Sequence, residues 1–405
     1  MAGSPSPSAA PAQPKILLAK SGLVTAGPVP GKFGRGGGEE ETAPLRSRLP
    51  PVGSLNLLSD SWDFHIDRLL PFLTENTDFT VVGVIGPPGA GKSTIMNEIY
   101  GFDGSSPGML PPFSIQSEDT KMMAKHCTVG IEPRVSAQRF ILLDTQPVFS
   151  PSVLAEMMRP DGSSMISLLS GEPLSAELAH EVMGIQLGIL LTSICHVVLV
   201  VCEGVHDYNM WNLMSTVDLL KHGIPDPSAL SSSQSQGSNP GLEKENLDKV
   251  NEGEEYMATP LFVHTKLQDE DLFPNTVVQL KKALGQYFCS SSYMRERCGN
   301  VVKDHPFSSV NHGTQSNDMD SAPLKLFAIP SKNRDDCARS QIESYISALW
   351  KLQNQVLSMN CPSFARTVSE RDWLKNSAKI WELVKKSPII AEYSRTLQSS
   401  GMFRR

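Results

Sequence analysis

One short stretch constrains this chain more than any other, because residues 86–93 read "GPPGAGKS" between the apolar run "TVVGVI" and the helical pattern "TIMNEIYG". It is a G-x-x-x-x-G-K-S/T loop in the strand–loop–helix context that gives the pattern its meaning. Such glycines let successive backbone N–H groups turn inward on a phosphate, with Lys92 reaching the β- and γ-phosphates and Ser93 coordinating Mg²⁺. The stretch predicts a phosphate-binding loop, whose residues are Gly86, Gly89, Ala90, Gly91, Lys92, Ser93 and Thr94.

Apolar β-branched runs alternate with helical patterns over most of the chain. Strands that alternate with helices imply a parallel sheet covered on both faces, whose ligands bind at the carboxyl ends of the strands. The expected fold class is therefore α/β, a P-loop NTPase sheet with helices on both faces, followed by C-terminal helices. The expected strands are residues 79–85, 139–145, 195–202, 260–266 and 324–330, and the expected helices between them are residues 93–100, 150–159, 174–193, 210–221 and 275–288.

The composition changes along the chain and predicts three parts. Residues 1–52 are rich in Pro, Gly and Ser and cannot bury enough apolar surface to fold, so we expect a disordered tail. Residues 53–360 form one nucleotide-binding domain with solvated polar insertions at 225–256 and 303–322, and residues 361–405 form a helical segment packed on it.

Some large apolar residues leave two interpretations open. Phe149, Trp373 and Trp381 are either buried in their own domain or anchors for a partner. In the helix expected after residue 340, one apolar face is predicted, made of Ile342, Ile346, Leu349, Leu352, Val356 and Leu357.

Charge and cysteine content exclude several classes of function. A net charge of −7 without a clustered basic face argues against direct nucleic-acid binding. Seven scattered cysteines without C-x-x-C spacing indicate a reducing, cytoplasmic location and no zinc site. The most apolar stretch, residues 182–202, is interrupted by Gln186, Ser193 and His196, which favours a buried helix and strand over a membrane span.

The second expected strand ends in "ILLDTQP", where Asp144 is followed by Thr145. ATPases of the AAA+ kind carry Glu after this Asp to activate water, whereas Asp-Thr is typical of G proteins, in which the Asp helps to hold Mg²⁺. We therefore expect Asp144 and Ser93 as the metal-binding residues. Thr128, in "HCTVGIEP", occupies the place of the threonine that senses the γ-phosphate, although an ordinary residue at a strand edge explains it as well.

Other positions depart from the G-protein pattern. Pro147 replaces the glycine whose N–H would bond the γ-phosphate, and Val148 replaces the glutamine that positions water, while Gln146 lies two residues early.

The base-recognition motif is altered in the same way. Thr265 and Lys266 are present, but Gln268 stands where the motif has Asp, and Asp269 comes one residue late. These departures predict a degenerate G domain that binds a purine nucleoside di- or triphosphate with Mg²⁺, of the ATP or the GTP type, and hydrolyses it slowly or not at all.

The stretches "GVIGPPGAGKS", "FILLDTQPVFSPSVL", "CHVVLVV" and "DWLKNSAKIWELVKKS" closely resemble nonsense-mediated mRNA decay factors of the suppressor-with-morphological-effect-on-genitalia family. The resemblance runs from about residue 57 to the C-terminus. It implies a non-catalytic, G-domain-like subunit that pairs with the larger eighth member of that family. It also implies docking on, and regulation of, the phosphatidylinositol-3-kinase-like kinase of the decay pathway. The alternatives are an active P-loop NTPase with slow hydrolysis and an interaction scaffold that binds no nucleotide.

Overall fold

The computed structural model describes residues 55–59, 61–102, 110–123, 125–159, 174–230, 255–294, 324–332 and 343–401. All of them belong to one compact unit, Pro51–Arg405. The predicted tail 1–52, the insertion 303–322, Ile342 and most of the insertion 225–256 lie outside the described residues.

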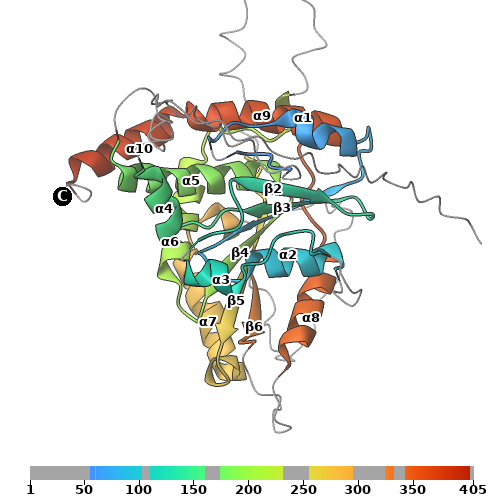
Figure 1. Ribbon diagram of the computed structural model, residues 1–405, viewed down its shortest axis with the longest axis vertical. Helices are drawn as coiled ribbons and strands as arrows, with labels where there is room; N and C mark the ends of the chain where they lie inside the picture. The colour runs from blue at the N-terminus through green and yellow to red at the C-terminus, as the bar shows by residue number, and fades with distance from the viewer. Residues whose placement is uncertain are drawn as a thin grey trace, which may run out of the picture. The chain divides into compact units, whose positions relative to one another are not determined.

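A six-stranded sheet forms the centre of the described unit, with the strand order β2-β3-β1-β4-β5-β6 (Figure 1). All neighbouring strands are parallel except β2, which pairs antiparallel with β3 at one edge. The α/β class is therefore confirmed, and the five strands expected from the sequence are parallel, whereas the antiparallel edge strand β2 departs from the predicted all-parallel sheet. The strands are β1 (Thr80–Ile85), β2 (Ile131–Val135), β3 (Phe140–Thr145), β4 (Val197–Glu203), β5 (Thr259–Leu267) and β6 (Lys325–Pro330).

Successive side chains of each buried strand point to opposite faces of the sheet. Both faces are therefore apolar, and helices cover both of them. In β1, Val82 and Val84 pack in one core cluster while Val81 and Ile85 pack in the other. The first cluster is closed by α2 (Lys92–Tyr100) and α8 (Tyr345–Leu357), and the short α3 (Glu118–Met122) contributes no buried residue. The second is closed by α4 (Pro151–Met157), α5 (Ala176–Ile194), α6 (Tyr208–Leu220) and α7 (Pro274–Tyr287).

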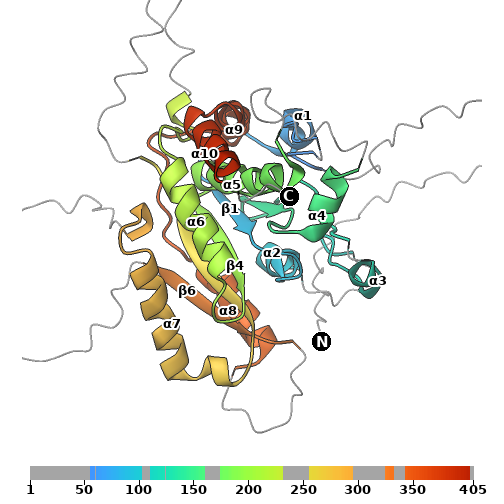
Figure 2. The ribbon, with the colours of Figure 1, turned by 90° about the vertical axis from the view of Figure 1, so that its left-hand side faces the viewer.

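The C-terminal helices α9 (Glu370–Lys385) and α10 (Pro388–Ser399) lie over α5 on the side away from the strands (Figures 1 and 2). Because α9 and α10 form this second layer, α5 is buried on nearly its whole circumference, and its sequence is almost continuously apolar. Within the part of the chain that the structure describes, no helix combines the length and apolar content of a membrane span.

Both tryptophans of α9 belong to the core. Trp373 donates from Nε1 to the Ile194 carbonyl at 2.8 Å, and Trp381 donates to the Trp62 carbonyl at 2.9 Å. Both side chains are fully buried, so they are core residues and not anchors for a partner. Phe149 is half-buried and packs against the same core cluster.

Two sequence predictions are wrong in detail. Leu349, Leu352 and Val356 of the predicted apolar face are buried, but Ile346 is 76% exposed, and Ala348 is the further buried residue of α8. The insertion predicted from residue 225 is not solvated at its start, since Asp226 and Ser228 are buried and Ser228 Oγ accepts a 2.9 Å hydrogen bond from the Arg366 backbone N–H.

Candidate functional site

The loop at residues 86–91 joins the carboxyl end of β1 to the first turn of α2. Gly89 and Gly91 have φ values of 72° and 95°, in the left-handed region that favours glycine. A Cβ at Gly86 would lie 2.6 Å from the Val201 carbonyl oxygen, so only glycine allows the loop to pass this close to β4. Thr94 follows in the first turn of α2 and is half-buried. The strand–loop–helix arrangement predicted around residues 86–93 is therefore present, with the N-terminus of α2 at the end of the loop.

The predicted metal-binding residues meet beside this loop. Ser93 Oγ donates to Asp144 Oδ2 at 2.7 Å, Thr128 Oγ1 donates to the same oxygen at 2.9 Å, and the two hydroxyl oxygens are 3.5 Å apart. Asp144 lies near the end of β3, next to β1 in the sheet, and Thr128 lies just before β2. The structure thus brings three residues from three separate segments into one cluster of oxygen atoms.

The electrostatics of the cluster suit a bound cation. Asp144 is fully buried, and burial raises the pKa of its carboxyl, although the hydrogen bond from Ser93 acts in the opposite direction. A cation would stabilise the ionised form of this carboxyl. Mg²⁺ requires oxygen ligands and commonly takes only one or two carboxylates, with water and phosphate completing its shell. One carboxylate and two hydroxyl oxygens therefore fit Mg²⁺. A different kind of metal site, built from three or more His, Cys, Asp or Glu side chains, is absent from the described residues.

Lys92 is buried in the loop itself. Its Nζ donates to the carbonyl oxygens of Gly86 and Pro87, both at 3.0 Å. Burial lowers the pKa of this ammonium from 10.5 to about 8, and the negative charge of Asp144 opposes part of that shift. A buried ammonium at a helix N-terminus favours a nearby anion, so the loop matches the electrostatic requirement of a phosphate.

Thr265 and Lys266 reach the same edge of the sheet from β5. Thr265 Oγ1 donates to the Ala90 carbonyl at 3.0 Å and to the Cys202 carbonyl at 3.2 Å, so it fixes the loop against two strands. Lys266 has a φ of 58° and forms a 2.9 Å ion pair with Glu203. The predicted base-recognition segment therefore lies beside the loop.

The residues after this segment form a short turn. Gln268 donates from its backbone N–H to Asp271 Oδ2 at 2.9 Å, and Asp269 starts the short turn Glu270–Leu272.

Sequence reasoning missed the contacts that join the Thr128 segment (residues 126–130) to the Asp144 segment (residues 144–156). His126 Nδ1 lies 2.9 Å from Ser152 Oγ, and Nε2 lies 3.7 Å from a carboxylate oxygen of Glu156. Gln146 makes two further bonds to Gly130. No sequence signal marks these pairs, because they depend on how β2 enters the sheet and how the chain leaves β3.

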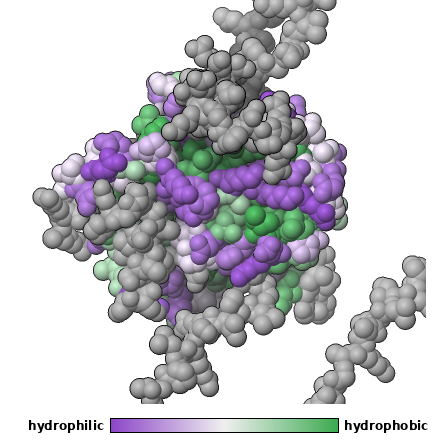
Figure 3. Space-filling view, turned by 90° about the horizontal axis from the view of Figure 1, so that it is seen from above, coloured by the Kyte–Doolittle hydropathy of each residue, from purple (hydrophilic) through white to green (hydrophobic). Residues whose placement is uncertain are grey.

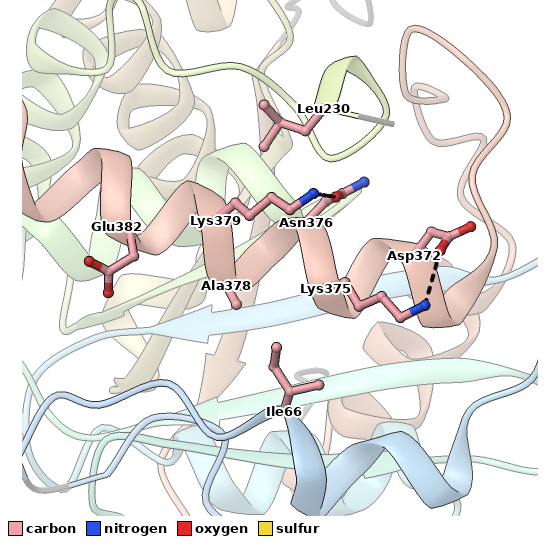
Figure 4. Close-up of a pocket in the computed structure, with 8 residues that line it drawn as sticks. All are labelled: Ile66, Leu230, Asp372, Lys375, Asn376, Ala378, Lys379 and Glu382. Carbon is pink, nitrogen blue, oxygen red and sulfur yellow. Dashed lines mark hydrogen bonds and ion pairs between the residues drawn. The ribbon is translucent and has the colours of Figure 1, made fainter. Parts of the chain in front are cut away.

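A separate hollow of about 440 Å³ lies along the outer side of α9 (Figure 4). Bands of hydrophilic and hydrophobic side chains cross the face seen from that side (Figure 3). None of the predicted site residues contributes to the hollow, which is lined by Ile66, Leu230, Asp372, Lys375, Asn376, Ala378, Lys379 and Glu382.

Comparisons with known proteins agree with the resemblance predicted from the sequence. The chain is 27% identical over 409 residues to the protein from Xenopus tropicalis named nonsense-mediated mRNA decay factor SMG9, a match that covers 96% of this chain and 75% of that protein. The protein of the same name from Xenopus laevis is 28% identical, with the same coverage. That from Salmo salar is 26% identical over 84% of this chain and 67% of its own length. No protein-family model matches the chain.

Proposed function

We propose that this chain, a homologue of the SMG9 nonsense-mediated mRNA decay factors, is a non-catalytic, nucleotide-binding regulatory subunit of a protein kinase complex in that pathway. The similarity to proteins of that name covers 96% of the chain and supports a role in nonsense-mediated mRNA decay. The kinase is of the phosphatidylinositol-3-kinase-like class, and the larger eighth family member is the direct partner. These two partners, and the cytoplasmic location, follow from the resemblance and from the cysteine content.

Nucleotide binding rests on one observation, the convergence of Ser93, Thr128 and Asp144 beside the loop that holds Lys92. Lys92 and the backbone N–H groups of the loop would bind the phosphates, and the oxygen cluster would hold Mg²⁺. Mg²⁺, when bound, would neutralise charge on the phosphates. Thr265, through the Ala90 carbonyl, holds the loop in the shape that this binding needs.

The chain around Asp144 argues against rapid hydrolysis. Val148 is buried, and its backbone N–H donates to the Gly86 carbonyl at 3.2 Å, so neither its side chain nor its N–H can orient water. Pro147 has no N–H to offer a terminal phosphate. The Val148 N–H therefore holds the loop and the chain after β3 together, which suits a subunit that keeps its nucleotide.

The nucleotide content of the purified chain, followed by phosphate release with added Mg²⁺ and nucleotide, tests this proposal. We expect a purine nucleotide to be released on denaturation and identified by chromatography, without multiple-turnover hydrolysis. Turnover above about 1 s⁻¹ would instead support an active NTPase. A chain that carries no nucleotide and binds none in titration calorimetry would support the interaction scaffold.

A further inference from the structure

Gln146 joins the two segments that surround the oxygen cluster. Its backbone N–H donates to the Gly130 carbonyl at 2.8 Å, and its side-chain Oε1 accepts from the Gly130 backbone N–H at 3.0 Å. These bonds continue the antiparallel pairing of β2 with β3 by one residue, with a side-chain oxygen in place of a backbone carbonyl. The Thr128 segment and the Asp144 segment are therefore held together at Gly130 by protein contacts alone.

The orientation of the Gln146 amide follows from chemistry. The Gly130 N–H is a donor and requires an acceptor, so the oxygen of the amide must face it and the nitrogen must face away. Only 6% of Gln146 is exposed. Within the described residues Nε2 has no hydrogen-bond partner, and the protein does not fully enclose it. A nearly buried side chain thus keeps one donor group open.

The surroundings of Gln146 indicate what that donor serves. Two residues earlier is Asp144 of the oxygen cluster, and two residues later is Val148, whose N–H bonds to the first glycine of the loop. Its partner Gly130 lies two residues after Thr128. Residue 146 is therefore flanked along the chain by Asp144 of the oxygen cluster and by Val148, which bonds to the loop, and its partner Gly130 follows Thr128.

We infer that Gln146 is a phosphate-binding residue of the nucleotide site: its amide nitrogen donates to the terminal phosphate of a nucleoside triphosphate, while its carbonyl oxygen holds the two segments together. This inference rests on the proposed nucleotide binding and adds a preference for triphosphate over diphosphate. The same geometry separates binding from hydrolysis. A glutamine that orients attacking water accepts a hydrogen bond from it, whereas Oε1 of Gln146 is turned toward the Gly130 N–H and Nε2 is the group left open.

Gln146→Glu gives the sharpest test. The new carboxylate still accepts from the Gly130 N–H, but it carries no donor and places negative charge beside the terminal phosphate. Titration calorimetry with Mg²⁺ compares non-hydrolysable triphosphates and diphosphates of adenosine and guanosine. We expect the affinity for triphosphate to fall roughly 10- to 150-fold, as for a lost charge-assisted hydrogen bond, with diphosphate affinity within about threefold of the parent.

Gln146→Met is the second variant, because it removes donor and acceptor without adding charge. It should lose the same preference for triphosphate, and it should also melt at a lower temperature because the Gly130 N–H loses its acceptor. An unchanged triphosphate-to-diphosphate affinity ratio in both variants overturns the role of Gln146 while leaving nucleotide binding intact. A parental chain that binds neither nucleotide overturns the proposed function, and this inference with it.

Discussion

The hydroxyl of Ser93 donates to Oδ2 of Asp144 at 2.7 Å, although Ser93 lies in the first turn of α2 and Asp144 lies near the end of β3. The two elements belong to neighbouring βα units, and β1 and β3 pair in parallel over four residues from Thr80 to Gly83. The contact therefore depends on the register between β1 and β3, and it brings the loop next to the buried carboxylate of Asp144.

Lys92→Ala should weaken nucleotide binding and leave the fold intact. The variant removes a buried ammonium at the N-terminus of α2 and with it the cation that would face the phosphates. A charge-assisted contact of this kind contributes roughly 1.5–3 kcal/mol, or about 10- to 150-fold in affinity. Titration calorimetry measures the loss, and circular dichroism checks the fold. Lys121→Ala, an exposed lysine of α3, is the matched control and should bind as the parent does. Equal affinity in all three proteins would contradict the assignment of the loop.

Hydrolysis by the isolated chain should be no faster than that of an unassisted G protein, on the order of 10⁻⁴ s⁻¹. The reason is local: Pro147 and Val148 supply no group that orients water, and Oε1 of Gln146 is turned toward the Gly130 N–H. Phosphate release under multiple turnover is the measurement. Release above about 1 s⁻¹ that Asp144→Ala abolishes would show that the chain is an enzyme.

Glu370→Ala should destabilise the chain strongly. The Glu370 carboxylate is fully buried at the start of α9 and accepts from Thr74 N–H at 2.8 Å, from Thr74 Oγ1 at 3.0 Å and from Arg139 Nε at 2.6 Å, with Arg139 Nη2 also bound. Removal of one partner from a fully buried ion pair costs about 3–5 kcal/mol, and because the Arg139 side chain is 31% exposed and water can reach it, we expect a cost at or below the lower end of that range.

Urea denaturation compares this variant with Glu382→Ala on the same helix. Glu382 is half-exposed and pairs with Lys385, so its loss should change the free energy of unfolding by no more than about 1 kcal/mol. If Glu370→Ala costs no more than Glu382→Ala, the Arg139–Glu370 contact does not hold α9 on the domain.

The sequence was sufficient for the sheet and the loop because their signals are local. Apolar β-branched runs predict buried strands, and the G-x-x-x-x-G-K-S/T pattern needs no distant residue to be recognised. The role of Thr128 stayed open because its contact with Asp144 spans two strands. The burial of Trp373 was equally undecided, since its partner, the Ile194 carbonyl, lies 179 residues away. The Gln146 contact required knowledge of the β2–β3 register, which no sequence pattern fixes.

His196 should make the stability of the chain depend on pH. Its Nδ1 accepts a 2.9 Å hydrogen bond from the Val81 backbone N–H, which requires the neutral ring, and burial lowers its pKa from 6.5 to about 4. As the pH falls below about 6.5 the unfolded chain binds a proton that the folded chain does not, so unfolding becomes more favourable. The contribution of His196 to stability is complete above that pH and is lost progressively toward pH 4, to a limit of about 3 kcal/mol.

His196→Asn keeps an acceptor for Val81 without a titrating group, so it should reduce the difference in unfolding free energy between about pH 7 and about pH 4.5. His222→Asn, at an exposed side chain, should retain the parental difference. Urea denaturation at both pH values is the measurement, and an equal loss of stability in His196→Asn and the parent would show that other groups cause it.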